Sequence, residues 1–386
     1  MSTQDHCHIP LSYAAPQAPV RLLELPPALL SLIESDSPPM CLKSSLAPKT
    51  SSSHVVLCTP SQTFSIRQVQ TSNSLYLLQP HAPTPCADSD AFPEIPQPGL
   101  TIVSTATSYL ELLPSTPDPI PQLYQSLPVY HGWDTGEDDE DSDFAMQTEL
   151  LDQKGYSGLL EHATVSDGEF LRAWTETGGF ELARIPHRPS AAISLQLFNK
   201  LSDASLLSRI HLFEPSKPFA TSNIWNAIDE DSLPIPFLEA FLRRVCDPME
   251  GTWGGDAGWV ITQPRLAACI GRLLLEAEHD KRKHLPRGSI KATEHPSLPG
   301  FLKNWKDFLV DKNVECNVSL DMLKGWYYQP TTLTVAWLEP GASPPAEVAK
   351  VSEVGDAPAP AAASTGAAAG RGRGKWHEKF AAKKRK

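Results

Sequence analysis

The sequence contains no hydrophobic run that approaches the roughly 20 residues needed to cross a bilayer. Its start, MSTQDHCHIPLSYAAP, lacks the charged and then apolar regions of a secretory signal peptide. The seven cysteines are odd in number, widely spaced and without a C-x-x-C pair, a pattern typical of a reducing compartment rather than of a disulfide framework. We therefore expect a soluble intracellular protein in which Cys58 and Cys269, both within apolar runs, are small buried side chains.

The sequence also lacks recognisable motifs for nucleotide binding, hydrolysis and zinc binding. The pair Gly374-Lys375 is followed by Trp376 rather than by Ser or Thr, so there is no P-loop, and the Gly-x-Ser-x-Gly turn of hydrolases is absent. The segment His6-Cys7-His8 has no second ligand pair at zinc spacing. Three other histidines fall near helix or strand ends without a nucleophile in a recognisable motif: His187, His211 and His279. We predict a protein that is not an enzyme and that holds no cofactor or metal.

Proline and tryptophan are distributed unevenly. Proline is in excess, with 37 residues, against an average usage of about 5%. Of these, 20 fall within the first 128 residues, where no tryptophan occurs. Because proline interrupts helices and sheet interiors, this part is expected to hold short strands joined by long loops. A chain of 386 residues has room for two to three domains.

Short apolar runs and period-two alternation predict strands in the first part of the chain. Strands are expected at 40–43, 55–58, 63–69, 75–78, 100–106 and 108–113, with a turn at 71–74 and one helical turn at 29–33. So few short strands are typical of a small antiparallel barrel or sandwich that leaves sheet edges open. Its apolar residues are core in the first interpretation and a partner interface in the alternative: Val55, Val56, Leu57, Phe64, Ile66, Leu75, Tyr76, Leu77 and Leu78.

An acidic run at 137–143 indicates a solvated linker and a domain boundary, since it lacks the glycine and the terminal glutamate of a calcium loop. Helical periodicity follows. Ser166 and Glu169 have the spacing of a capping box, Gly178-Gly179 end the helix, and 180–185 is expected to be a strand. A helix, a capped helix and a strand in so short a span resemble a winged-helix unit.

Further helices are expected at 191–201, 237–245, 264–278 and 299–309, with a short strand at 258–261. Thr262 and Ser319 are the predicted N-caps of the helices that begin after them, the second of which ends at Gly325. Segments 326–328 and 331–338 are expected to form a hairpin. The segment beyond 340, rich in Ala, Pro and Gly, is expected to be disordered.

The net charge of −12 is unevenly spread, because residues 371–386 carry eight Lys or Arg against one acid. An acidic body does not favour nucleic acid, so the basic tail is the one nucleic-acid signal. Three residues resemble an AT-hook that lacks its proline, and four form a cluster of the nuclear-import type: Arg371, Arg373 and Lys375, and Lys383, Lys384, Arg385 and Lys386. Import is favoured over direct DNA contact, and we predict a nuclear protein.

Between residues 20 and 340, the order and spacing of several short segments match those of a known family. They are RLLEL at 21–25, VLCTPSQTFSIR at 56–67, TSNSLYLL at 71–78, YLEL at 109–112, FEL at 180–182, TQPRLAACIGRLLL at 262–275, FLKNWKD at 301–307 and SLDMLKG at 319–325. This series resembles the family of sister chromatid cohesion subunits (the defective-in-sister-chromatid-cohesion family) of the alternative replication factor C clamp loader.

The resemblance implies an α+β protein whose N-terminal small antiparallel β-barrel is completed by partner chains and is followed by tandem winged helices. Its implied parts are a disordered start, the barrel, an acidic linker, two winged-helix regions and a disordered basic tail, at 1–19, 20–130, 131–148, 149–247, 248–340 and 341–386. The implied partners are two chromosome transmission fidelity subunits, one small and one the C-terminus of the large ATPase subunit, together with DNA polymerase epsilon and the sliding clamp. The implied role is non-catalytic, in clamp loading or unloading, DNA replication and cohesion.

One departure from the family concerns the end of the chain. The family ends with a further winged helix that contributes to DNA binding, whereas here GKWHEKF at 374–380 looks like the start of its first helix and the chain stops six residues later. Either a basic tail replaces that unit or the sequence is truncated. The alternative function is a transcription or chromatin factor that places winged helices directly on DNA, and a hydrolase without a recognisable motif is the third.

Overall fold

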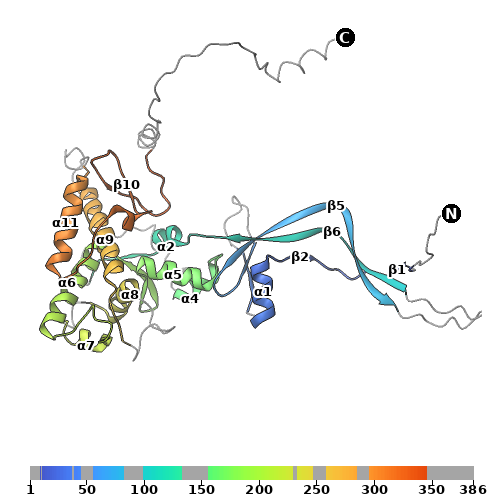
Figure 1. Cartoon of the computed structure of the whole chain (residues 1–386), viewed down its shortest axis with the longest axis horizontal. Helices are drawn as coiled ribbons and strands as arrows, with labels where there is room; N and C mark the ends of the chain where they lie inside the picture. The colour runs from blue at the N-terminus through green and yellow to red at the C-terminus, as the bar shows by residue number, and fades with distance from the viewer. Residues whose placement is uncertain are drawn as a thin grey trace, which may run out of the picture. The chain divides into compact units, whose positions relative to one another are not determined.

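The computed structural model describes residues 9, 11–36, 39–44, 55–81, 99–132, 155–228, 233–246, 258–284 and 295–345. Its first part is a mixed sheet of six strands: β1 (Leu11–Tyr13), β2 (Leu22–Glu24), β3 (Cys41–Ser44), β4 (Val55–Cys58), β5 (Thr63–His81) and β6 (Gly99–Ser115). The strand order is β1-β6-β5-β4-β3, and β2 also pairs with β6. Figure 1 shows β5 and β6 side by side, with β1 and β2 at separate places along β6.

The turn predicted at 71–74 is wrong, because these residues lie within strand β5. The chain continues through these residues as one strand of 19 residues, and β6 likewise joins the two strands predicted at 100–106 and 108–113. Gln70 pairs with Ser108 and Leu75 with Ala106, so the four residues between them on β5 face a single residue on β6. The polar run is therefore a bulge. Both of its flanks pair with the same long partner strand, which outweighs the local turn signal.

The described strands are not closed into a barrel, since β3 lies at one end of the strand order and β1 at the other. The sheet is also not purely antiparallel as predicted, because β1 and β2 run parallel to β6. Helix α1 (Pro27–Asp36) is longer than the single predicted turn. It buries Leu29 against Leu57, Phe64 and Leu112, and these four residues form the buried cluster between the helix and the sheet.

A three-stranded sheet and three helices follow β6: α2 (Ile120–Ser126), β7 (Val129–Tyr130), α4 (Gly155–His162), α5 (Asp167–Thr177), β8 (Phe180–Leu182) and β9 (Ile185–Pro189). The predicted capping box on α5 is confirmed, and Gly178 ends that helix with φ 72°. The strand predicted at 180–185 is instead the first arm of a hairpin. Ala183 and Arg184 both have positive φ, the conformation of a two-residue turn whose twist suits a hairpin.

The remaining elements are α6 (Ala191–Leu207), α7 (Thr221–Trp225), α8 (Ile235–Val245), α9 (Gln263–Lys283), α11 (Leu298–Asp311), η1 (Leu320–Leu323), β10 (Tyr327–Tyr328) and β11 (Ala336–Trp337). The predicted helices at 191–201, 237–245, 264–278 and 299–309 and the final hairpin are confirmed, with different ends. The strand predicted at 258–261 is reduced to isolated bridges of Trp259 and Ile261. Thr262 and Ser319 make no capping side-chain hydrogen bond, and only a 3-10 turn follows Ser319.

These helices enclose the main core of the chain, in which Phe198, Phe237, Leu266, Ile270 and Trp305 are all fully buried. Cys58 and Cys269 are buried and free, as predicted. All these elements belong to a single unit formed by Met1–Ser343. Among the described residues no helix combines the length and apolarity needed to cross a membrane.

Candidate partner-binding surface

The N-terminal sheet has little core of its own. Its buried cluster contains Leu29, Leu57, Phe64 and Leu112, whereas the cluster of the helical part extends from Tyr130 to Trp337. A sheet gains stability mainly by burying one face. Val56, Cys58, Ile102 and Ala106 are also buried outside this cluster. From residue 65 to residue 80 of β5, however, no side chain is buried, so this strand has little cover from the described part of the chain.

The outer edge of β5 is open over most of its length. Strand β4 pairs with β5 only at Thr63, Phe64 and Ser65. From residue 66 to residue 81, the described strands pair with β5 only through β6, on its other side. We call residues 66–81 the β5 edge (Figure 1). Its outward backbone N–H and C=O groups are positioned to pair with a further strand.

The nine apolar residues predicted for this region divide into three groups by exposure. Val56, Leu57 and Phe64 are buried, at 8%, 8% and 2% exposure, and belong to the chain's own sheet. Ile66 and Leu77 are half-buried. The exposed members are Val55, Leu75, Tyr76 and Leu78, at 44%, 42%, 50% and 47% exposure. Three of these four lie on the β5 edge, where an apolar partner would cover them.

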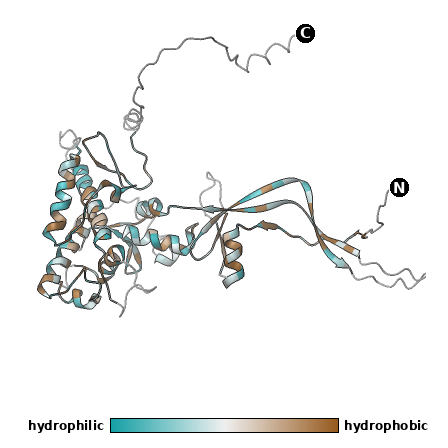
Figure 2. Cartoon of the chain, viewed as in Figure 1, coloured by the Kyte–Doolittle hydropathy of each residue, from teal (hydrophilic) through white to brown (hydrophobic). Residues whose placement is uncertain are grey.

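The short outer strands add exposed apolar residues that the sequence analysis did not single out. On β1, Leu11 and Tyr13 are 61% and 65% exposed, and on β3, Leu42 is 68% exposed. Figure 2 shows apolar residues recurring along the strands of this sheet. Each of these two strands, with three and four residues, is too short to show a hydrophobic period in the sequence.

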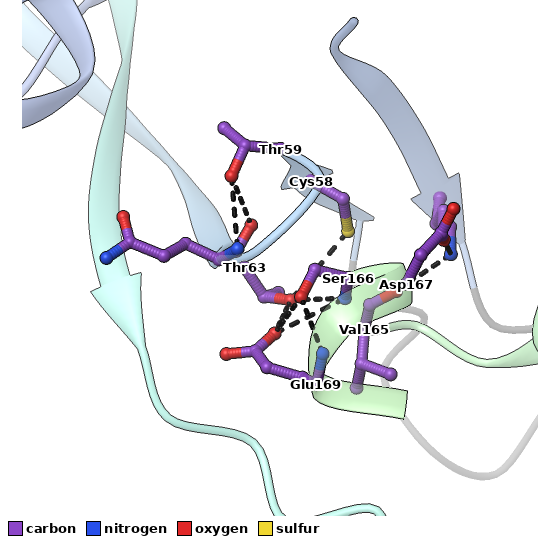
Figure 3. Close-up of polar contacts among 9 residues, drawn as sticks. Cys58, Thr59, Thr63, Val165, Ser166, Asp167 and Glu169 are labelled. Atoms are coloured by element: carbon purple, nitrogen blue, oxygen red, sulfur yellow. Dashed lines mark hydrogen bonds and ion pairs between the residues drawn. The ribbon is translucent and has the colours of Figure 1, made fainter. Parts of the chain in front are cut away.

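The capping box of α5 also holds the sheet in place (Figure 3). Thr63 lies on β5 with its hydroxyl between the two capping residues. It donates to Glu169 Oε2 at 2.5 Å and accepts from the Ser166 N–H at 2.7 Å. Ser166 Oγ donates to the same carboxylate oxygen at 2.7 Å. Thr63 and Ser166 are 1% and 0% exposed, so these bonds are made without competition from solvent.

Lys43 provides a second link between the sheet and α5. Its ammonium group donates to Val165 O at 2.8 Å and to Asp167 Oδ1 at 2.9 Å. The Gly168 N–H donates to Pro60 O at 2.9 Å, and a Cβ at Gly168 would lie 2.9 Å from that oxygen. The turn between β4 and β5 is thus fixed on the first turn of α5.

Two of the buried cysteines, Cys58 and Cys269, give no sign of activation. Burial raises the pKa of the Cys58 thiol, and it raises the pKa of Cys269 to about 11. A reactive thiolate requires the opposite shift. No group of three or more His, Cys, Asp or Glu that could hold a metal ion occurs among the residues that the structure describes.

The sequence of the chain matches a known protein family. A sequence model of the family described as "Sister chromatid cohesion protein Dcc1" matches residues 20–342. The chain belongs to this family. The match covers every described element from β2 to β11, and the Dcc1 family is a cohesion family rather than a family of enzymes. Membership therefore implies a role in sister chromatid cohesion. A search of individual curated proteins found no match.

The seven basic residues singled out in the tail lie outside the described residues and beyond the matched region: Arg371, Arg373, Lys375, Lys383, Lys384, Arg385 and Lys386. The acidic run at 137–143 is likewise not described.

Proposed function

We propose that this Dcc1-family chain is a non-catalytic subunit of the cohesion-linked, alternative replication factor C clamp loader. In this proposal two chromosome transmission fidelity subunits, the small one and the C-terminus of the large ATPase subunit, add strands to its sheet. The supporting observation is the β5 edge, which combines unpaired backbone with exposed Leu75, Tyr76 and Leu78.

Strand addition would satisfy both features of this edge at once. A partner strand supplies N–H and C=O groups along the 66–81 segment, and its side chains cover the exposed apolar ones. Each of Leu75, Tyr76 and Leu78 is about half exposed, so covering it contributes about 1 kcal/mol. An unpaired strand edge also promotes aggregation, and a permanently bound partner would prevent this.

We further propose that the elements after β6 form winged helices. The order α2, β7, α4, α5, β8, β9 and the sheet order β7-β9-β8 suit a winged-helix unit. Leu123 of α2 and Leu127, which follows that helix, share a core with Phe170 and Trp174 of α5. This packing favours a boundary of the partner-completed sheet near the end of β6, with α2 assigned to the first winged helix.

In such a unit, α5 occupies the position of the helix that reads DNA. Its charged residues are Asp167, Glu169 and Glu176 against Arg172, and its first turn is covered by the sheet through Lys43. An acidic, covered helix does not suit a DNA groove. This disfavours the alternative of a transcription or chromatin factor. We propose that the helical part contacts DNA polymerase epsilon and that the basic tail serves nuclear import and weak DNA contact.

The test is co-purification of the full chain with the two chromosome transmission fidelity subunits. The variant Tyr76→Lys/Leu78→Lys places charges on the β5 edge and is expected to weaken binding at least tenfold while its circular dichroism spectrum stays unchanged. The matched control is Leu206→Lys/Leu207→Lys, at exposed positions of α6. Equal binding by the edge variant and the native chain, or equal loss in the control, would reject the proposed interface.

DNA binding separates this proposal from its alternative. The accessory subunit is expected to bind DNA weakly and with steep salt dependence. Nanomolar, sequence-selective binding by the isolated chain would instead support the transcription factor.

A further inference from the structure

Three arginines line one small cavity in the helical part of the chain. The cavity has a volume of about 110 Å³ and lies among α5, α8, α9 and the residues just before β10. Arg244 comes from α8, Arg265 and Arg272 come from α9, and Glu176 of α5 is the one carboxylate among the described residues that line the cavity. These described residues together carry three positive charges and one negative charge.

Glu176 is already bound to one of the three arginines. Arg272 pairs with the Glu176 carboxylate through Nη1 and donates from Nη2 to Glu176 O at 2.8 Å. Its guanidinium carbon also lies 4.1 Å from the centre of the Trp326 ring. Arg265 Nη1 donates to Cys246 O at 2.9 Å. The excess of positive charge at the cavity is thus not removed by Glu176.

Two of the lining arginines each have a buried nitrogen without a hydrogen-bond partner among the described residues, namely Nε of Arg244 and Nε of Arg272. The two residues are 7% and 3% exposed. No carboxylate of the described residues forms an ion pair with Arg244. Burial raises the pKa of Glu276, although the nearby Arg244 charge acts in the opposite direction. The Glu276 carboxylate is bonded to Tyr124 and lies near Arg188.

A buried arginine without an anion is costly, and such groups in proteins are normally paired or bound to a ligand. The guanidinium fork matches the oxygens of phosphate better than any other cationic side chain does. The cavity is large enough for one tetrahedral anion and too small for a nucleotide or a duplex. Cys269, which also lines it, stays an uncharged thiol because burial raises its pKa to about 11, so it does not repel an anion.

We propose that this arginine cavity binds a single phosphate group, held chiefly by Arg244, Arg265 and Arg272. The group is either a free phosphate ion or the phosphate monoester of a modified side chain on a partner protein. Because α5, α8 and α9 all contribute to the cavity, a bound phosphate would strengthen the packing of these three helices.

Thermal unfolding of the full chain tests the proposal, in buffers of equal ionic strength with inorganic phosphate or with chloride. Phosphate at 100 times its dissociation constant is expected to raise the Tm by roughly 5 °C. Arg244→Met should abolish this shift and keep at least the native Tm in chloride, because it removes a buried, unpartnered charge. The matched control is Arg243→Met, whose side chain pairs with Glu239 away from the cavity; it should keep the phosphate shift.

A second variant covers the case in which Arg244→Met does not fold. Arg244→Lys retains the charge but not the fork, and titration calorimetry should show one site with about tenfold weaker phosphate binding. A phosphoserine peptide that competes for the same site and binds more tightly than phosphate identifies a partner side chain, and no competition identifies the free ion. An equal Tm in phosphate and chloride for the native chain, or an unchanged shift in Arg244→Met, would overturn the proposal.

Discussion

Thr63→Val should weaken the contact between the sheet and the helical part without changing the shape of the buried side chain. The hydroxyl of Thr63 donates to Glu169 at 2.5 Å and accepts from the Ser166 N–H at 2.7 Å. Valine has the same shape and makes neither bond. After the substitution the Ser166 N–H retains only a contact of 3.3 Å with Glu169 Oε2.

The expected magnitude follows from these bonds. Loss of a hydrogen bond to a charged group costs about 1.5–3 kcal/mol, and a poorly satisfied buried N–H adds about 1 kcal/mol. The added methyl group of valine returns about 0.8 kcal/mol at a position that is 1% exposed. We therefore expect the free energy of unfolding to fall by about 2–3 kcal/mol.

Urea denaturation of the full chain measures this loss, and amide hydrogen exchange locates it. The amides of Ser166 and Gly168 should exchange faster in Thr63→Val, since both donate to the sheet. Thr71→Val is the matched control, because its hydroxyl accepts only from the exposed Asn73 N–H. A change below about 0.5 kcal/mol in Thr63→Val, or one equal to that of the control, would refute the role assigned to this hydroxyl.

Three further substitutions test other parts of the structure. Leu29→Ala should cost about 2–4 kcal/mol and speed hydrogen exchange in α1, because Leu29 is 1% exposed in the small core of the sheet; unchanged exchange in α1 would contradict this packing. Gly271→Ala should destabilise the chain by more than about 2 kcal/mol in thermal unfolding, despite better helix propensity, because the new Cβ would clash with the Trp305 ring. Burial lowers the pKa of His187 from 6.5. As the pH falls below that value, the unfolded state takes up a proton before the folded state does, so the free energy of unfolding decreases. His187→Phe should reduce this loss in urea titrations between pH 7 and about 5, whereas His211→Gln, at an exposed position, should not.

Local sequence signals predicted the elements whose causes are local. The capping box at Ser166 and Glu169 and the left-handed Gly178 concern neighbouring residues, so the sequence placed α5 correctly. Helices with a clear apolar stripe, such as α9, were found for the same reason, although their ends shifted by a few residues.

Features that depend on distant residues were missed or misread. The polar residues 71–74 have the composition of a turn, and only the shared partner strand β6 makes them a bulge. The capping box also binds the sheet, and this contact depends on Thr63, which lies 103 residues before Ser166. The arginine cavity joins residues of three helices, and no spacing in the sequence relates Arg244 to Arg272.

For a similar reason, the nine residues predicted as core or interface include both covered and exposed side chains. A strand with one covered face shows the same apolar residues whether its partner lies in the same chain or in another. Leu57 and Phe64 proved to be covered by α1, while Tyr76 and Leu78 are exposed. Only the positions of β4 and α1 along β5 distinguish the two groups.

Hydrogen exchange along the β5 edge is the most direct test of partner completion. In the full chain alone, amides of residues 66–81 that do not bond to β6 should exchange rapidly. In the complex with the two chromosome transmission fidelity subunits, the same amides should become protected at least a hundredfold while those of α6 remain unchanged. Equal exchange along the β5 edge with and without the partners would contradict the claim that other chains complete this sheet.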